Sequence, residues 1–322
     1  MELAQNLFTI PLKTTYSTVT TLIPANYILP LIVIISLTML ISSTYYKNKK
    51  MFIYTGLSSI ILLSLKYMCK QQIELLTFEP NNMDLSNNSF KTITYNINVL
   101  PFSSRGNDYP KLVKYLKDFD IIMIQESFYT PLKNGAKNNF SKSLNQEGYD
   151  VLVSPSPDFL NTTQWGDSGL IIAVNTSKLR IIDYEFIPFN NGGSIDSVSQ
   201  KGILKATTLN NLGDTIVILN THAQAGYVNS WPDDGLHEDV RWKQLEQMAG
   251  IISGIHSQII FGGDFNFRSE EEIQILSKHF KYSSINSLDA IFTTQQIFTK
   301  PEFNNPFGSD HYSVETTILN KN

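Results

Sequence analysis

The 322-residue chain has little cysteine and little charge. It contains one cysteine, Cys69, which excludes an intramolecular disulfide and a zinc site built from several cysteines. None of its five histidines forms an HExxH pair, so the helical zinc motif of metalloproteases is also excluded. The formal net charge of −4 argues against a nucleic-acid partner, because such proteins usually carry a basic face.

Charge is missing altogether from a long N-terminal stretch, residues 14–46. Its most apolar part, residues 27–46, is long enough as a helix to cross a hydrocarbon core about 30 Å thick. A second apolar run over residues 51–68 carries one charge, Lys66. We therefore expect residues 1–78 to form a membrane-anchor region and the protein to be an integral membrane protein. A buried helical hairpin is the alternative, and the sequence decides neither whether the second run spans nor which side the remainder faces.

The polar segment over residues 79–89 has the composition of a linker, and residues 90–322 form the expected catalytic domain. Short β-branched runs bounded by turn formers predict strands near residues 91–98, 121–124, 169–174, 202–208, 215–220, 258–262 and 312–318. Helical spacing follows Pro110, surrounds Trp242 and begins at Glu270. Strands that outnumber helices favour an α+β fold.

Polar side chains follow the apolar strands at five places in this domain. They are carboxylates, amides and imidazoles, with no thiol among them: Gln125 and Glu126; Asn220 and His222; Asp264 and Asn266; Asp289; Asp310 and His311. Oxygen ligands together with neutral imidazoles suit Mg²⁺ that assists attack on a phosphoryl group.

The order of the motifs TYNINVL, IQES, NTH, GGDFN, LDAIF and SDH resembles the endonuclease/exonuclease/phosphatase superfamily over about residues 90–318. The resemblance implies two packed mixed β-sheets flanked by helices, the four-layer DNase-I-like sandwich. It also implies dependence on Mg²⁺, for which Mn²⁺ is a possible substitute.

Within the superfamily the sequence is most similar to the neutral sphingomyelinases. The matching residues are Thr94 and Asn96, Asp167 to Gly169, Ser199, Lys201 and Gly202, Thr221 to Ala225, and Arg241 and Gln244 on a helix. This resemblance implies a phosphodiesterase whose partner is sphingomyelin or a related phospholipid in a bilayer. A membrane-tethered endonuclease, exonuclease or phosphatase, and a non-catalytic lipid-binding module, are the alternatives. The sequence does not give the oligomeric state.

The resemblance also implies roles for individual residues. Glu126 would be the principal Mg²⁺ ligand, with Asn96 holding the metal or its water. His311 would be the general base, Asp264 would orient the attacking water, and Asp310 would share this charged environment.

The remaining roles concern the phosphate and the imidazoles. His222 and Asn266 would hydrogen-bond the non-bridging phosphate oxygens during catalysis, and Lys201 would bind the substrate. Asp289 would support a catalytic imidazole, and the sequence leaves open which one.

Overall fold

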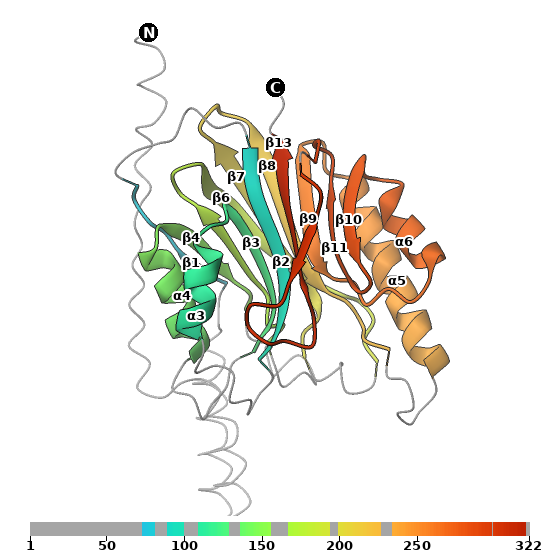
Figure 1. Ribbon diagram of the computed structural model, residues 1–322. Helices are drawn as coiled ribbons and strands as arrows, with labels where there is room; N and C mark the ends of the chain where they lie inside the picture. The colour runs from blue at the N-terminus through green and yellow to red at the C-terminus, as the bar shows by residue number, and fades with distance from the viewer. Residues whose placement is uncertain are drawn as a thin grey trace, which may run out of the picture. The chain divides into compact units, whose positions relative to one another are not determined.

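The computed structural model describes residues 73–80, 89–99, 109–128, 136–155, 167–193, 199–226, 234–297 and 299–319. All of them belong to one compact unit, Lys70–Asn322. The ribbon in Figure 1 shows its strands running side by side, with helices at two opposite flanks.

One mixed sheet contains seven strands within the described residues. Their order is β1 (Glu74–Leu76), β4 (Tyr149–Val153), β5 (Ile171–Asn175), β3 (Ile121–Ser127), β2 (Ser89–Val99), β13 (Ser313–Leu319) and β12 (Glu302–Asn304). Its parallel pair is β2 and β3, with Thr92 opposite Ile121, and its other pairs are antiparallel.

The second mixed sheet contains six described strands. Their order is β10 (Tyr282–Asn286), β11 (Asp289–Thr293), β9 (Gln258–Asp264), β8 (Thr215–His222), β7 (Gly202–Asn210) and β6 (Leu179–Pro188). Here β8 and β9 are parallel. Parallel neighbours need a crossover connection, and α5 (Asp234–Ser253) lies in the connection between these two strands.

The two sheets pack face to face through an apolar core. Successive side chains of a strand point to opposite faces, so in β3 Ile121 and Met123 face the second sheet while Ile122 and Ile124 face outward. Both faces of β3 are therefore covered, which explains its unbroken apolar run. Fully burying each such side chain contributes roughly 1.5–3 kcal/mol.

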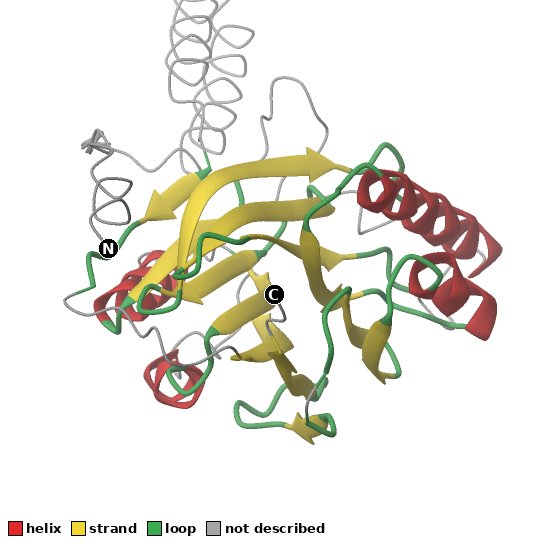
Figure 2. Cartoon of the chain, turned by 90° about the horizontal axis from the view of Figure 1, so that it is seen from above, coloured by secondary structure: helices red, strands yellow, loops and turns green. Residues whose placement is uncertain are grey.

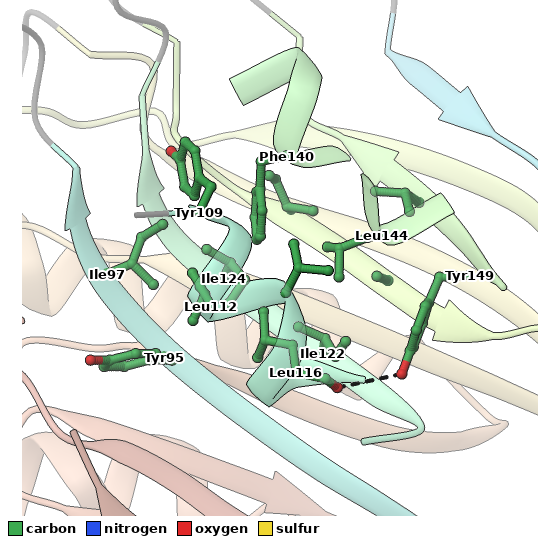
Figure 3. Packing of buried hydrophobic residues seen from close by; sticks show 14 of the residues in the cluster. Tyr95, Ile97, Tyr109, Leu112, Leu116, Ile122, Ile124, Phe140, Leu144 and Tyr149 are labelled. Carbon is green, nitrogen blue, oxygen red and sulfur yellow. Dashed lines mark hydrogen bonds between the residues drawn. The ribbon is translucent and has the colours of Figure 1, made fainter. Parts of the chain in front are cut away.

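Helices cover the outer faces and complete four layers. α3 (Tyr109–Leu116) and α4 (Ala136–Gln146) cover the first sheet, whereas α5 and α6 (Glu270–Ser277) cover the second, as Figure 2 shows from above. Figure 3 shows the packing under the first pair of helices, where residues of both helices and of the sheet form one apolar cluster: Tyr109, Leu112, Leu116, Phe140, Leu144, Ile122 and Ile124. The predicted fold, two packed mixed sheets flanked by helices, is confirmed.

Several elements were not expected from the sequence. α4 and the strands β1, β4, β6, β10 and β12 had no clear periodic signal, and β6 alternates poorly because it is the exposed edge of its sheet. β1 pairs with β4 through Leu75 and Leu152, so the first sheet includes residues that precede the predicted domain start at residue 90.

The structure contradicts the predicted integral membrane localisation. Among the residues that it describes, no helix combines the length and the apolar composition needed to cross a bilayer. α5, the longest described helix, carries Glu238, Asp239 and Arg241 within its span. The two apolar runs on which the prediction depended, residues 27–46 and 51–68, lie outside the described residues. Membrane anchoring therefore has no part in the function proposed below.

Candidate active site

The predicted site residues meet at one end of the two sheets. Glu126 lies near the end of β3, and His222 and Asp264 end the parallel strands β8 and β9. Asp289 begins β11 and pairs with Asp264 in the antiparallel register. Because these strand ends share one edge, residues far apart in the sequence become neighbours.

Asn96 joins the two carboxylates of the site. Its Nδ2 donates hydrogen bonds to Glu126 Oε1 at 3.0 Å and to Asp264 Oδ2 at 2.9 Å. Its Oδ1 accepts a hydrogen bond from the Asn98 backbone N–H. In this arrangement the amide group orients both carboxylates, and the role of Asn96 as a metal ligand stays a prediction.

His222 lies close to the same two carboxylates, those of Glu126 and Asp264. Its Nε2 is 3.6 Å from Asp264 Oδ2 and 3.8 Å from Glu126 Oε1. Both distances are longer than a hydrogen bond. They leave the imidazole where one ligand bound between the three side chains would contact all of them.

His311 contacts the site through two carboxylates. Its Nδ1 lies 2.7 Å from Asp289 Oδ2, and its Nε2 lies 3.7 Å from Asp264 Oδ2. The structure thereby identifies His311 as the imidazole that Asp289 supports. Donation from Nδ1 to Asp289 leaves Nε2 of a neutral imidazole able to accept a proton.

Burial and pairing shift the pKa values of this pair. Burial, together with the neighbouring Asp264 carboxylate, raises the pKa of Asp289 to about 7, although His311 opposes the shift. Burial lowers the pKa of His311, but the hydrogen bond to Asp289 and the charges of Asp264 and Asp289 outweigh it and raise that pKa to about 9. Two carboxylates therefore lie beside a half-buried imidazole and favour its protonated form.

Three site residues hold a left-handed backbone that is unusual for side chains other than glycine. Their φ angles are +54° at Glu126, +53° at Asn266 and +49° at Asn98. Gly169 makes the conformation of Glu126 possible, because a Cβ at this glycine would lie 3.1 Å from Glu126 Cα. Such strain clusters at functional sites, where the surrounding structure enforces it.

Asn266 and Lys201 converge on one carbonyl next to His222. Asn266 Nδ2 and Lys201 Nζ donate to Ala223 O at 3.2 and 2.7 Å. Lys201 is buried, so it is not a surface charge. Asp310 is exposed and accepts a hydrogen bond from Asn98 Nδ2 at 2.6 Å.

Two contributors were missed by sequence reasoning. Asn98 links Asn96 to Asp310, and Ser309 Oγ donates to Asn96 O at 2.7 Å and accepts from the His311 N–H. Both residues belong to the motifs TYNINVL and SDH, and these motifs were the available signal. Ser309 thereby connects the segment of His311 to β2, the strand that carries Asn96.

The donor chemistry fits a divalent cation. Single ligand atoms of Glu126, His222 and Asp264 lie within 4.8 Å of one another, and so do those of Asp264, Asp289 and His311. Asp264 and Asp289 are almost fully buried, and Asp289 Oδ1 has no hydrogen-bond partner among the described residues. Buried carboxylates that are not fully compensated favour a bound cation, and carboxylate oxygens with an imidazole are suitable ligands.

A comparison with known protein families agrees with this arrangement of site residues. The profile of the Endonuclease/Exonuclease/phosphatase family matches residues 93–311. A search of curated proteins finds no significant match.

Solved structures show the same fold. The beta toxin of Staphylococcus aureus, in a mutant form with bound magnesium ions, has 18% identity and a TM-score of 0.55, covering 72% of this chain and 100% of its own. Sphingomyelinase C from Streptomyces griseocarneus has 18% identity and a TM-score of 0.53, covering 71% and 99%. TDP2 of D. rerio, complexed with a single-strand DNA product, has 16% identity and a TM-score of 0.51, covering 72% and 99%.

Proposed function

The chain belongs to the endonuclease/exonuclease/phosphatase family, and on this premise we propose that it is an Mg²⁺-dependent phosphodiesterase similar to sphingomyelinases. Its proposed reaction is hydrolysis of sphingomyelin or a related phospholipid to a phosphorylated headgroup and a lipid. The observation that carries the proposal is the hydrogen-bonded pair of buried Asp289 and half-buried His311, whose Nε2 lies 3.7 Å from Asp264.

His311 is the general base of the proposed reaction. Asp289 holds the proton on Nδ1, so Nε2 accepts a proton from a water molecule that attacks the phosphorus. Asp264 Oδ2, 3.7 Å from this Nε2, accepts the other hydrogen of the same water and fixes its direction of attack.

His222 and Asn266 act on the phosphoryl group. Negative charge grows on the non-bridging oxygens in the transition state, and donors held in advance stabilise it there. Lys201 keeps the neighbouring Ala223 carbonyl in place and adds positive charge to this side of the site.

Glu126 and Asp264, oriented by Asn96, are the carboxylates that would hold Mg²⁺. A bound Mg²⁺ would supply positive charge beside the phosphoryl oxygens, and Mn²⁺ would supply the same charge with similar ligand preferences.

A phospholipid substrate is favoured over nucleic acid by charge. The chain after residue 80 contains 19 Lys and Arg against 26 Asp and Glu. A polyanionic strand would be repelled by this excess, whereas a zwitterionic headgroup presents one phosphate to the metal site. DNA hydrolysis is the second candidate, because TDP2 in complex with a DNA product shares the fold.

A substrate panel tests the proposal. Purified protein with Mg²⁺ is incubated with labelled sphingomyelin, phosphatidylcholine, single-stranded DNA and inositol phosphates, with the His311→Ala variant as the control. Release of a phosphorylated headgroup by the parent protein alone would support the proposal. Turnover of DNA or inositol phosphates without any turnover of the lipids would overturn it.

A further inference from the structure

Two polar side chains on the inner face of α5 are buried outside the site described above. Arg241 is 2% exposed and Gln244 is 0% exposed, three residues apart on the helix. Burying such groups without partners is costly, so their hydrogen bonds indicate what they hold.

Gln244 holds the segment that follows His222. Its Oε1 accepts a hydrogen bond from the Gln224 backbone N–H at 2.8 Å, and its Nε2 donates to Asn191 O at 2.8 Å. Gln224 lies two residues after His222, and its own side chain accepts a hydrogen bond from the Gly193 N–H. The helix thus ties down the segment over residues 223–226.

Arg241 holds the segment that follows Asn266 through one intermediate carboxylate. Its Nε donates to Glu272 Oε1 at 2.8 Å, and Glu272 Oε2 accepts from the Arg268 backbone N–H at 2.6 Å. Glu272 is 1% exposed, and removing one partner of such a buried pair would leave an uncompensated charge.

The two segments are also bonded to each other. The Ala223 N–H donates to Asp264 O at 2.8 Å, and Asn266 Nδ2 donates to Ala223 O at 3.2 Å. A displacement of either segment would therefore change the distance between His222 and Asn266.

We propose that Gln244 and Arg241 are positioning residues, through which α5 sets the spacing of the two groups that bind the phosphoryl oxygens. This inference rests on the proposed function for the roles of His222 and Asn266. Neither Gln244 nor Arg241 contacts the site carboxylates. Gln244 acts on the backbone of the segment after His222, and Arg241 acts through a carboxylate on the backbone of the segment after Asn266.

The same helix offers a matched control for Gln244. Gln247 accepts a hydrogen bond from the Asn190 N–H and donates to Pro188 O, both at 3.0 Å, so it makes the same two kinds of bond. Its partners lie in a segment that carries no site residue. Gln244→Met and Gln247→Met are therefore compared under identical conditions, well below both unfolding midpoints.

The kinetic readout is the split between kcat and KM. Gln244→Met is expected to lower kcat about tenfold or more while KM changes less than about twofold, because misplaced donors weaken mainly the transition state. Gln247→Met is expected to retain kcat within about twofold. Equal kcat values for the two variants would overturn the proposal.

A double-mutant comparison asks whether Gln244 acts through His222. In a His222→Ala background, the effect of Gln244→Met on kcat should shrink, because coupled residues are not additive. An undiminished effect in that background contradicts the inference.

Backbone amide hydrogen exchange tests the same link without any activity. Exchange at Gln224 should be faster in Gln244→Met than in Gln247→Met, and unchanged exchange would overturn the inference. If the parent protein hydrolyses no phosphodiester, the proposed function fails while the exchange measurement still decides the positioning role. Should Gln244→Met not fold, Gln244→Asn, one methylene shorter, is compared with Gln247→Asn in its place.

Discussion

Asp289 Oδ2 and His311 Nδ1, from residues 22 positions apart, lie 2.7 Å from each other at the meeting point of the two sheets. Replacing Asp289 with Asn should lower kcat by about 10²- to 10⁴-fold, because the carboxylate holds the imidazole in the tautomer that accepts a proton. Steady-state kinetics measure this effect, and Asp183→Asn, an exposed position on β6, is the control. An Asp289→Asn enzyme with the parent kcat would remove His311 from the role of base.

The pH dependence of the same variant has a defined sign. His311 must be neutral to accept a proton, so kcat/KM falls as the pH drops below its pKa. The Asp289 carboxylate raises this pKa, so Asp289→Asn should move the acidic limb of the profile to lower pH. Because a bound cation opposes the upward shift, both profiles are recorded at the same Mg²⁺ concentration. An acidic limb that stays at the same pH, or moves to higher pH, would show that a group other than His311 titrates.

Removal of the proposed metal ligand should abolish turnover. Glu126→Gln keeps the hydrogen-bonding shape but removes the charge, and kcat/KM should fall by more than about 10²-fold. EDTA should inactivate the parent protein, and Mg²⁺ or Mn²⁺ should restore it. Glu185 is an exposed carboxylate on β6, and Glu185→Gln should leave kcat/KM unchanged. Full activity in EDTA would refute the metal assignment.

Gly169 should control the metal ligand through the backbone. Its φ is +67°, and a Cβ there would lie 3.1 Å from Glu126 Cα and 3.2 Å from Glu126 N. Gly169→Ala should therefore raise the Mg²⁺ concentration for half-maximal activity roughly tenfold, as expected when support of a metal ligand is lost. Gly213→Ala, at φ +90° with no atom near the added Cβ, reports backbone strain alone. Equal metal dependence in the two variants would contradict the explanation.

Asn220 should stabilise the contact between the sheets below the site. Its Nδ2 donates to Ile124 O and Ile171 O at 2.8 and 2.9 Å, and its Oδ1 accepts from Gln125 Nε2 at 2.6 Å. Asn220→Leu removes the side-chain donor to both buried carbonyls and the acceptor of Gln125, and it should lower the free energy of unfolding by about 3 kcal/mol. Urea denaturation measures the loss. Gln274→Leu, at an exposed position of α6, should change it by less than about 0.5 kcal/mol.

The strands that carry most of the chemistry were predictable from local pattern, because β3, β8 and β9 are short apolar runs followed at once by polar side chains. The sequence by itself placed Glu126, His222 and Asp264 at strand ends and Asp289 inside an apolar strand, and the order of the motifs indicated the family. Periodicity was also sufficient for α3, α5 and α6, whose apolar positions pack on the sheets. It was insufficient for α4 and for several strands, among them the edge strands β6 and β12, which are largely exposed and alternate weakly.

Only the tertiary structure decided which side chains act together. Asp289 begins β11, which pairs with β9, and His311 lies in the segment just before β13. No local pattern in the sequence encodes the contact between these two residues. The buried positions of Lys201 and Gln244 likewise follow from long-range packing. The predicted membrane localisation relied on two apolar runs with little charge that lie outside the described residues, and no described helix has the length and apolar composition to cross a bilayer. Local composition specifies the elements, but contacts between distant residues specify the site, because only folding brings their side chains within hydrogen-bonding distance.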